Sequence, residues 1–436
     1  MTPAIQAPLL PKNKQERSPE KHGSSAAGVV FNVSTSIIGA GIMSMPAAFK
    51  VLGVIPALLM IAIIAFLANV SVGFLMKFTI AGEATTYAGV MKESFGKAGS
   101  VAVQVATMGA TFGCQIIFSI IIGDVLSGNE NGGSVHLGIL QQWFGSHWWN
   151  TRIFAVFFVF VFVLLPLVLC RRVEKLAISS AISVLLAVLF VIISAVLAIS
   201  ALVQGKTKNP RLFPELDEGG SFFNLFTAVP VIVTAFTFHF NVHPIGFELS
   251  DPLDVIPPVR ISLVLCSVIY FATGLFGYLL FGEATMSDIL VNFDQSSDSS
   301  IGSFLNDVVR LSYALHLILV FPLLNFSLRA NLDELLFPNK PSLAKDTKRF
   351  LGLTLALLIS CFLAAIAIPD IWYFFQFIGS TTTVSIAFIF PAAIVLRDVH
   401  GLSTSREKIV AAIMLVLAVA TSVIAISSDI YSFTTK

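Results

Sequence analysis

The sequence predicts an all-α integral membrane protein with eleven transmembrane helices. Hydrophobic residues make up 56% of the 436 residues and charged residues only 12%, whereas about a quarter of the residues of a soluble domain are charged. The mean hydropathy is +0.89. Uncharged stretches such as 153–170 approach the roughly 20 apolar residues that a helix needs to cross a bilayer. These observations exclude the ordinary soluble classes.

Apolar runs between charged or turn-rich breaks predict the positions of the spans. We expect them at 25–49, 54–80, 99–127, 151–170, 174–203, 221–249, 259–282, 302–328, 348–368, 370–396 and 407–430. The segment 83–97 mixes charged and apolar residues, which is typical of a short amphipathic helix at the membrane surface.

The N-terminal tail differs from the rest of the chain. Residues 1–22 are polar and hold four prolines, and they lack the apolar core and cleavage site of a signal peptide. We therefore expect a disordered cytosolic tail at 1–22 and one transmembrane transporter domain at 23–436.

Basic residues predict the orientation of the chain. Of the 26 Lys and Arg residues, 19 fall in the tail and the loops on its side of the membrane, and 7 fall on the other side. Cytosolic loops carry the excess of Lys and Arg, so we expect a cytosolic N-terminus. An odd number of spans then places the C-terminus on the opposite side.

Two spans contain residues that interrupt a helix. In the first span, the polar run 31–36 precedes Gly39, Gly41 and Pro46; in the sixth, the segment 236–249 holds two histidines, an asparagine, a proline and a glycine. Interruptions at corresponding places of two halves point to a transporter binding site. Because these interruptions lie five spans apart, they predict a five-plus-five inverted repeat, with repeats at 25–203 and 221–396 and an extra helix at 407–430.

Other interpretations of these residues are open. Gly39 and Gly41 can allow close packing of helices, and prolines can simply kink a span. His239 and His243 stand four residues apart, a spacing that suits a metal on one helix face, but a zinc hydrolase has glutamate after the first histidine, where this chain has Phe240. The matching places of the two interruptions favour a transport site.

At these two segments the sequence resembles the amino acid/auxin permease family, most closely its branch of vacuolar and neutral amino acid transporters, and it looks plant- or fungal-like. The matching residues are Phe31-Asn32, Ser34 and Gly39-Ala40-Gly41-Ile42 in the first span, and His239, Pro244-Ile245 and Glu248-Leu249 in the sixth. The resemblance implies a LeuT-like fold of the amino acid/polyamine/organocation superfamily. It also implies an amino acid bound between the broken spans and a vacuolar or, second, a plasma membrane location.

The chemistry of the breaks suits the same substrate. Free amides and the positive end of a helix dipole at 39–41 suit a carboxylate, and free carbonyls around 236–239 suit an α-ammonium group. Side chains then tune which amino acid fits, with plain structural packing as the alternative role. The predicted substrate-binding residues are Ser36, Gly39, Ala40, Gly41, Phe238, His239, Asn241 and Tyr313, with Thr107 and Thr111 as further candidates for tuning.

The eighth span bears on the coupling ion. Sodium-coupled relatives carry a threonine hydroxyl there, but at the matching positions this chain has Ile318 and Val320, which supply no oxygen ligand. Protons are therefore the favoured coupling ion, since histidine titrates near neutral pH. The candidates are His239 first, then His316 and Glu248. Symport, antiport and passive, gradient-driven flux all remain open. The alternative role for His239 is a hydrogen bond across the break of the sixth span, without taking up a proton.

Other classes of protein are disfavoured. The chain has no zinc-hydrolase helix, P-loop or Gly-x-Ser-x-Gly elbow, and its four cysteines lie in or beside apolar segments, which argues against a disulfide framework and a metal cluster. The net charge of +1 suggests no nucleic acid partner. We therefore do not expect an enzyme, and we expect no cofactor. The protein is expected to work as a monomer in the lipid bilayer and to bind an amino acid and protons. An amino acid sensor without net transport is the alternative.

Overall fold

The computed structural model describes residues 26–131, 134–169, 177–215, 221–247, 249, 251–293, 300–337, 340, 343–368 and 371–434, and every structural statement below concerns these residues. The predicted tail at 1–22 and Glu248 lie outside them. In the first part of the chain the elements are α1 (Ala26–Ile37), η1 (Ala40–Ser44), α2 (Met45–Leu52), α3 (Val54–Ala81), α4 (Tyr87–Ser127), β1 (Asn129–Asn131), β2 (Ser134–His136), α5 (Ile139–Phe144), η2 (Trp148–Asn150), α6 (Arg152–Phe158), the π-helical η3 (Val159–Leu164), α7 (Leu165–Val168) and α8 (Ala177–Val203).

The second part of the chain is also almost entirely helical. Its elements are α9 (Ser221–Ala235), α10 (His239–Gly246), η5 (Pro252–Val255), α11 (Ile256–Phe281), η6 (Gly282–Ala284), α12 (Ile289–Asn292), α13 (Ser300–Leu336), η7 (Leu343–Lys345), α14 (Thr347–Ala367), α15 (Ile371–Ile378), the π-helical η8 (Gly379–Thr383) and η9 (Ser385–Ile389), α16 (Phe390–Arg397) and α17 (Ser405–Thr434).

The apolar helices confirm a multi-pass, helical membrane protein. Within the described ranges, nine helices are long and apolar enough to cross a membrane, and the bent pair Ala26–Ile37 and Ala40–Leu52 makes a tenth. The predicted span at 151–170 corresponds to the shorter apolar helix Arg152–Val168. The count of eleven therefore stays a prediction, as do the boundaries of the two repeats.

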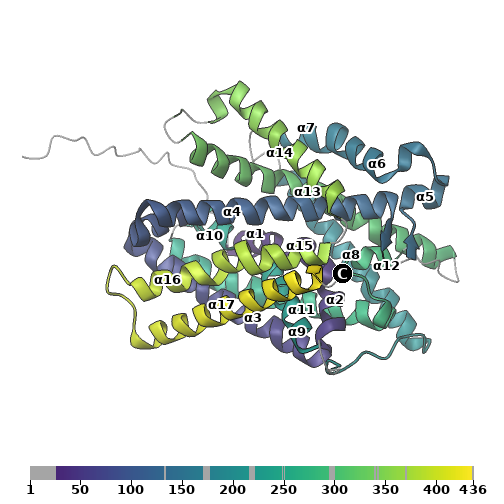
Figure 1. Ribbon diagram of the computed structural model, residues 1–436, viewed down its shortest axis with the longest axis horizontal. Coiled ribbons are helices and arrows are strands. Elements are labelled where there is room, and N and C mark those ends of the chain that lie inside the picture. The colour runs from purple at the N-terminus through teal and green to yellow at the C-terminus, as the bar shows by residue number, and fades with distance from the viewer. Residues whose placement is uncertain are drawn as a thin grey trace, which may run out of the picture.

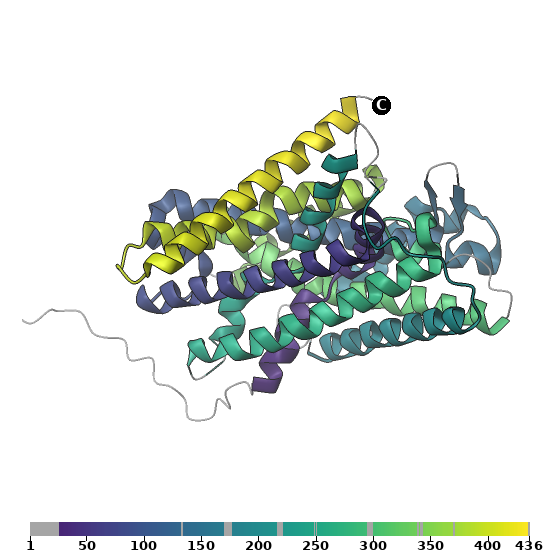
Figure 2. The same cartoon turned by 90° about the horizontal axis from the view of Figure 1, so that it is seen from below.

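The long helices lie roughly along one direction (Figure 1). One side of α4 contacts α6 and α14, and α13 packs against both α4 and α8. On another face α11 and α8 lie side by side (Figure 2). The helix α4 bends at Gly96, whose φ is +67°, so a short helix precedes the span predicted at 99–127. Strands β1 and β2 form a small antiparallel hairpin in which Asn129 lies opposite His136.

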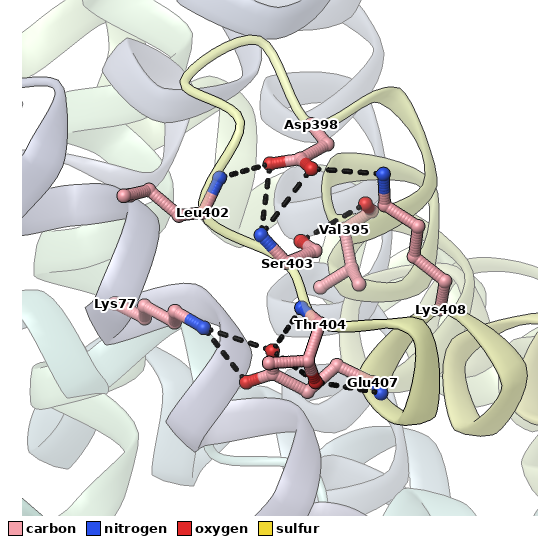
Figure 3. Close-up of polar contacts among 8 residues, drawn as sticks. All are labelled: Lys77, Val395, Asp398, Leu402, Ser403, Thr404, Glu407 and Lys408. Carbon is pink, nitrogen blue, oxygen red and sulfur yellow. Dashed lines mark hydrogen bonds and ion pairs between the residues drawn. The ribbon is translucent and has the colours of Figure 1, made fainter.

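The turn between α16 and α17 is fixed by polar contacts (Figure 3). Asp398 has a left-handed backbone, with φ of +46°, and its Oδ1 accepts hydrogen bonds from the amides of Leu402 and Ser403 at 2.8 and 3.2 Å. Lys408 pairs with the same carboxylate at 2.9 Å. Glu407 pairs with Lys77 of α3 at 2.8 Å, so this turn joins α17 to α3.

Both interrupted spans are broken in the structure. Helix α1 ends at Ile37, Gly39 is extended, and the following segment is turned by 53°. Pro46 occupies the first turn of α2, where its missing N–H costs nothing. In the sixth span, α9 ends at Ala235 and α10 begins at His239, while Pro244 lies inside α10. The break in the sixth span therefore falls at 236–238, ahead of the proline.

Candidate functional site

The two breaks are held together by one tyrosine of α11. The hydroxyl of Tyr270 lies 2.6 Å from the carbonyl oxygen of Ile37 and 2.9 Å from that of Ala235, the last residues of α1 and α9. Tyr270 is fully buried. It reaches carbonyls at helix ends, which lack partners inside their own helix. Sequence reasoning did not single out Tyr270, because nothing in its neighbourhood distinguishes it from other tyrosines in apolar spans.

Close contact between the breaks depends on Gly41. A Cβ atom at this position would lie 2.5 Å from the Cβ and 2.7 Å from the Cα of Ala235. Because the obstructing atoms include backbone, no side-chain rotation can relieve the overlap. The predicted glycine pair therefore differs in role: Gly41 permits the approach of α9, whereas a Cβ at Gly39 would meet only Phe118, at an ordinary 3.7 Å.

The predicted substrate-binding residues of the first span lie at its break. The carbonyl oxygen of Gly39 accepts a hydrogen bond from the hydroxyl of Tyr313, on α13, at 2.6 Å. The amides of Ala40 and Gly41 begin η1, and the first amides of a helix have no partner within it. The break thus carries two amides that the helix η1 itself does not pair.

Two further predicted residues meet across the broken spans. Asn241 of α10 donates from Nδ2 to Oγ of Ser36, on α1, at 3.2 Å. The Ser36 hydroxyl in turn donates to the carbonyl oxygen of Asn32, one turn earlier, at 2.9 Å. This places an amide side chain and a hydroxyl, which 205 positions separate in sequence, beside one another.

His239 and Phe238 are enclosed by aromatic and aliphatic groups. Both are fully buried. The two rings are 5.2 Å apart, and Phe388 of η9 lies edge-on to the histidine at 6.5 Å. Neither ring nitrogen of His239 makes a hydrogen bond to a described residue, although the backbone of Ala68 interacts with the ring. In this conformation His239 does not bond across the break.

His316 contacts both the first break and the neighbouring helix α8. Its Nδ1 lies 2.6 Å from the carbonyl oxygen of Ser183, and the backbone of Ile38 interacts with the same ring. The ring packs 4.8 Å from that of Tyr313. Since a carbonyl only accepts, Nδ1 carries the hydrogen, and Nε2 is the nitrogen that can take up a proton.

A cavity of about 450 Å³ lies at the C-terminal ends of α10 and α13. Its wall includes Gln104, Thr107, Phe240, His243, Asn331 and Glu334. Of the two threonines predicted to tune the substrate, Thr107 lines this cavity, whereas Thr111 donates to the carbonyl oxygen of Thr107 at 2.7 Å and is fully buried.

His243 takes part in a network of side chains. It lies 2.9 Å from Oγ1 of Thr79, and Tyr87 stacks on it at 5.9 Å while donating to the carbonyl oxygen of Ile386 in η9 at 2.7 Å. Among the described residues, no three His, Cys, Asp or Glu side chains gather as a metal site would require.

The fold, with its paired breaks, is that of LeuT-like membrane proteins. A manganese transporter from Eremococcus coleocola matches with a TM-score of 0.62 at 15% identity, covering 96% of this chain and 90% of that one. MhsT in complex with L-phenylalanine matches with a TM-score of 0.60 at 13% identity, covering 93% and 99%. Similarity at this level of identity shows the fold alone.

Sequence comparison gives the family. The chain belongs to the transmembrane amino acid transporter protein family, whose model matches residues 22–433. It is 80% identical to amino acid transporter AVT6C of Arabidopsis thaliana, over 99% of both chains. It is 47% identical to amino acid transporter AVT6A of the same plant, over 99% of this chain and 94% of that one. The resemblance to the amino acid/auxin permease family, and to plant members of it, is confirmed. The protein is a transporter rather than an enzyme.

Proposed function

We propose that this protein carries amino acids across a cellular membrane, with the substrate bound between the breaks at 38–41 and 236–239. The observation that supports this most is the contact of the Tyr270 hydroxyl with both helix ends, Ile37 and Ala235, because it brings the two breaks together, and we expect amides of one break and carbonyls of the other to serve the same substrate. A zwitterion needs such a pair of donors and acceptors. The relatives named as amino acid transporters support the same substrate class.

Coupling to protons, or gradient-driven flux, is proposed rather than coupling to sodium. The positions that would supply hydroxyl ligands on α13 are Ile318 and Val320, and aliphatic side chains do not bind a hard cation. The contacts support His316 as the proton-binding group over His239. His316 connects the first break to α8, so a proton on Nε2 can alter how firmly the break is held, whereas His239 has mainly apolar neighbours. Glu248 remains a third candidate.

The vacuolar membrane is the proposed location, with the N-terminus in the cytosol. The bias of basic residues supports the orientation. In that orientation the cavity faces the cytosol, and the opposite side faces the vacuolar lumen. We also propose that the protein works as a monomer.

Flux measurements in liposomes that hold only this protein test the proposal. We expect uptake of neutral amino acids that is accelerated by an imposed pH gradient and is indifferent to replacing sodium with choline. Uptake that no gradient affects indicates a facilitator. Uptake that requires sodium contradicts the coupling proposal. Binding of amino acids without flux of any of the twenty favours the alternative, a membrane sensor.

A further inference from the structure

The side of the molecule opposite the cavity is closed by the segment 282–293, which we call the lid. The cavity lies at the C-terminal end of α13 and the lid precedes its N-terminal end, and a 37-residue helix is about 55 Å long. The lid residues Ile289, Leu290 and Phe293 are almost completely buried. The short helix α12 packs against α4 and η1. The lid therefore covers the first broken helix from the side away from the cavity.

Polar contacts hold the lid to the first broken span. The hydroxyl of Ser44, at the end of η1, donates to the carbonyl oxygen of Ser287 at 2.8 Å. Lys50 of α2 donates to the carbonyl oxygen of Thr285 at 3.2 Å. Any opening of the molecule on this side has to break these contacts and expose the lid to water.

Asp288 lies inside the closed lid and is only 2% exposed. Its Oδ1 accepts a hydrogen bond from the amide of Leu290 at 2.9 Å, while Oδ2 has no hydrogen-bond partner among the described residues. Burying an ionised carboxylate with an oxygen left unpaired is costly. A proton on the carboxyl group removes the charge and so removes most of that cost.

The charged and titratable groups facing Asp288 come from α4 and α13. Asp124 of α4 faces it and pairs with Arg152 of α6, and Arg310 and Tyr313 of α13 also interact with it. Burial raises the pKa of Asp288 well above its ordinary value, and the nearby Asp124 raises it further. The amide of Leu290 and the positive charge of Arg310 act in the opposite direction without reversing the shift.

The lid and its neighbours also carry Glu283, in η6, and Lys50, which donates to the carbonyl oxygen of Thr285, but neither is among the groups that shift the pKa of Asp288. The residues of η1, Ala40–Ser44, carry no titratable side chain. On α11, the hydroxyl of Tyr278 donates to Glu283 at 2.7 Å. Arg310 donates to the carbonyl oxygen of Leu137 at 2.7 Å and to Gln142 at 3.0 Å, which anchors the outer connection between α4 and α6.

We infer that Asp288 is a proton-binding site of the lid: it holds a proton while the lid is closed and releases it when the lid opens. The closed state binds the proton more tightly than the open, hydrated state. Protonation therefore favours the closed lid fully at low pH. This contribution weakens as the pH rises from the ordinary pKa of aspartate toward the raised pKa of Asp288 in the closed lid. Because the proton is taken up from and returned to the same side, the site regulates opening without carrying protons across. This proton site does not depend on which substrate or coupling ion the protein uses.

Labelling of a buried lid cysteine tests this inference. Val291, in α12, is 4% exposed, and Val291→Cys places a thiol that is accessible only when the lid opens. The full-length protein in detergent is labelled with a polar maleimide between pH 5 and 8, and the chain's own four cysteines give the baseline. The same cysteine is introduced together with Asp288→Asn, an uncharged group of the same shape. The ratio of the two labelling rates cancels the effect of pH on the thiol itself.

We expect this ratio, aspartate over asparagine, to grow with pH by up to about tenfold per pH unit, the limit for one linked proton. Asp307, near the start of α13, bonds Trp143 at 2.9 Å, and Asp307→Asn is a control that leaves the pH response intact. Asp288→Glu keeps a titratable group and retains a pH response, which separates loss of the proton site from misfolding. A ratio that stays constant with pH, or an equal effect of Asp307→Asn, overturns the inference.

Discussion

The hydroxyl of Tyr313 donates to the carbonyl oxygen of Gly39 at 2.6 Å, so α13 holds the first broken span at its break. The same ring packs against Phe190 of α8 at 4.9 Å and against His316. A tyrosine predicted to tune the substrate thus also fixes the backbone that would bind it. Its role in transport can be separated from packing, because phenylalanine keeps the ring and loses only the hydroxyl.

We expect Tyr313→Phe to lower amino acid uptake roughly fivefold, since one hydrogen bond contributes about 1 kcal/mol. Uptake in proteoliposomes, measured at matched protein content, checks this. The melting temperature should fall only slightly, because the aromatic contacts remain. Unchanged uptake would show that the break does not need this hydroxyl.

Gly41 and Gly73 form a matched pair of glycines. We expect Gly41→Ala to abolish uptake, because the added Cβ would overlap Ala235 at 2.5 Å and push the two breaks apart. Gly73→Ala, in α3, meets nothing within 4 Å and should leave uptake within about twofold, since alanine also favours a helix. Uptake and size-exclusion profiles of both variants provide the measurement. Equal behaviour of the two variants contradicts the close approach at Gly41.

His316 and His239 give opposite expectations for the dependence of uptake on pH. His316→Gln keeps a donor for the carbonyl oxygen of Ser183 but cannot take up a proton, so we expect acceleration by a pH gradient to disappear while some uptake remains. His239→Gln should retain the acceleration. Initial rates at several imposed gradients distinguish the two. Loss of acceleration in His239→Gln alone would return the coupling role to His239.

Asp398 should stabilise the turn between α16 and α17 mainly as a carboxylate. Its hydrogen bond with Lys408 lowers the pKa of Asp398, so the ionised form stabilises the turn above the ordinary value of about 3.9 and the stabilisation is lost as the pH falls through the lowered pKa. At neutral pH, we expect Asp398→Ala to speed hydrogen exchange at the amides of Leu402 and Ser403. Peptides from α14 serve as the internal control. Unchanged exchange would mean that the backbone of the turn keeps its conformation without the Asp398 carboxylate.

The sequence by itself determined the class of protein and the places where its helices break. Hydropathy is a local property, and a helix in a bilayer has to satisfy its own backbone, so apolar length alone locates most spans. Gly39, Gly41 and Pro46 marked the first break for the same local reason. In the sixth span the proline does not mark the position of the break, because Pro244 lies inside α10 and the break falls at 236–238.

Only the tertiary structure decided which side chains meet. Tyr270 joins two helix ends that lie 35 and 233 positions away, and Asp288 is enclosed by groups from α4 and α13. Thr111 looked equivalent to Thr107, yet only Thr107 reaches the cavity. Histidines with similar sequence surroundings differ in the same way: His239 is packed among aromatic rings, while His316 bonds the backbone of α8. Such contacts depend on how helices pack across long separations in sequence, and a one-dimensional pattern carries no information about that packing.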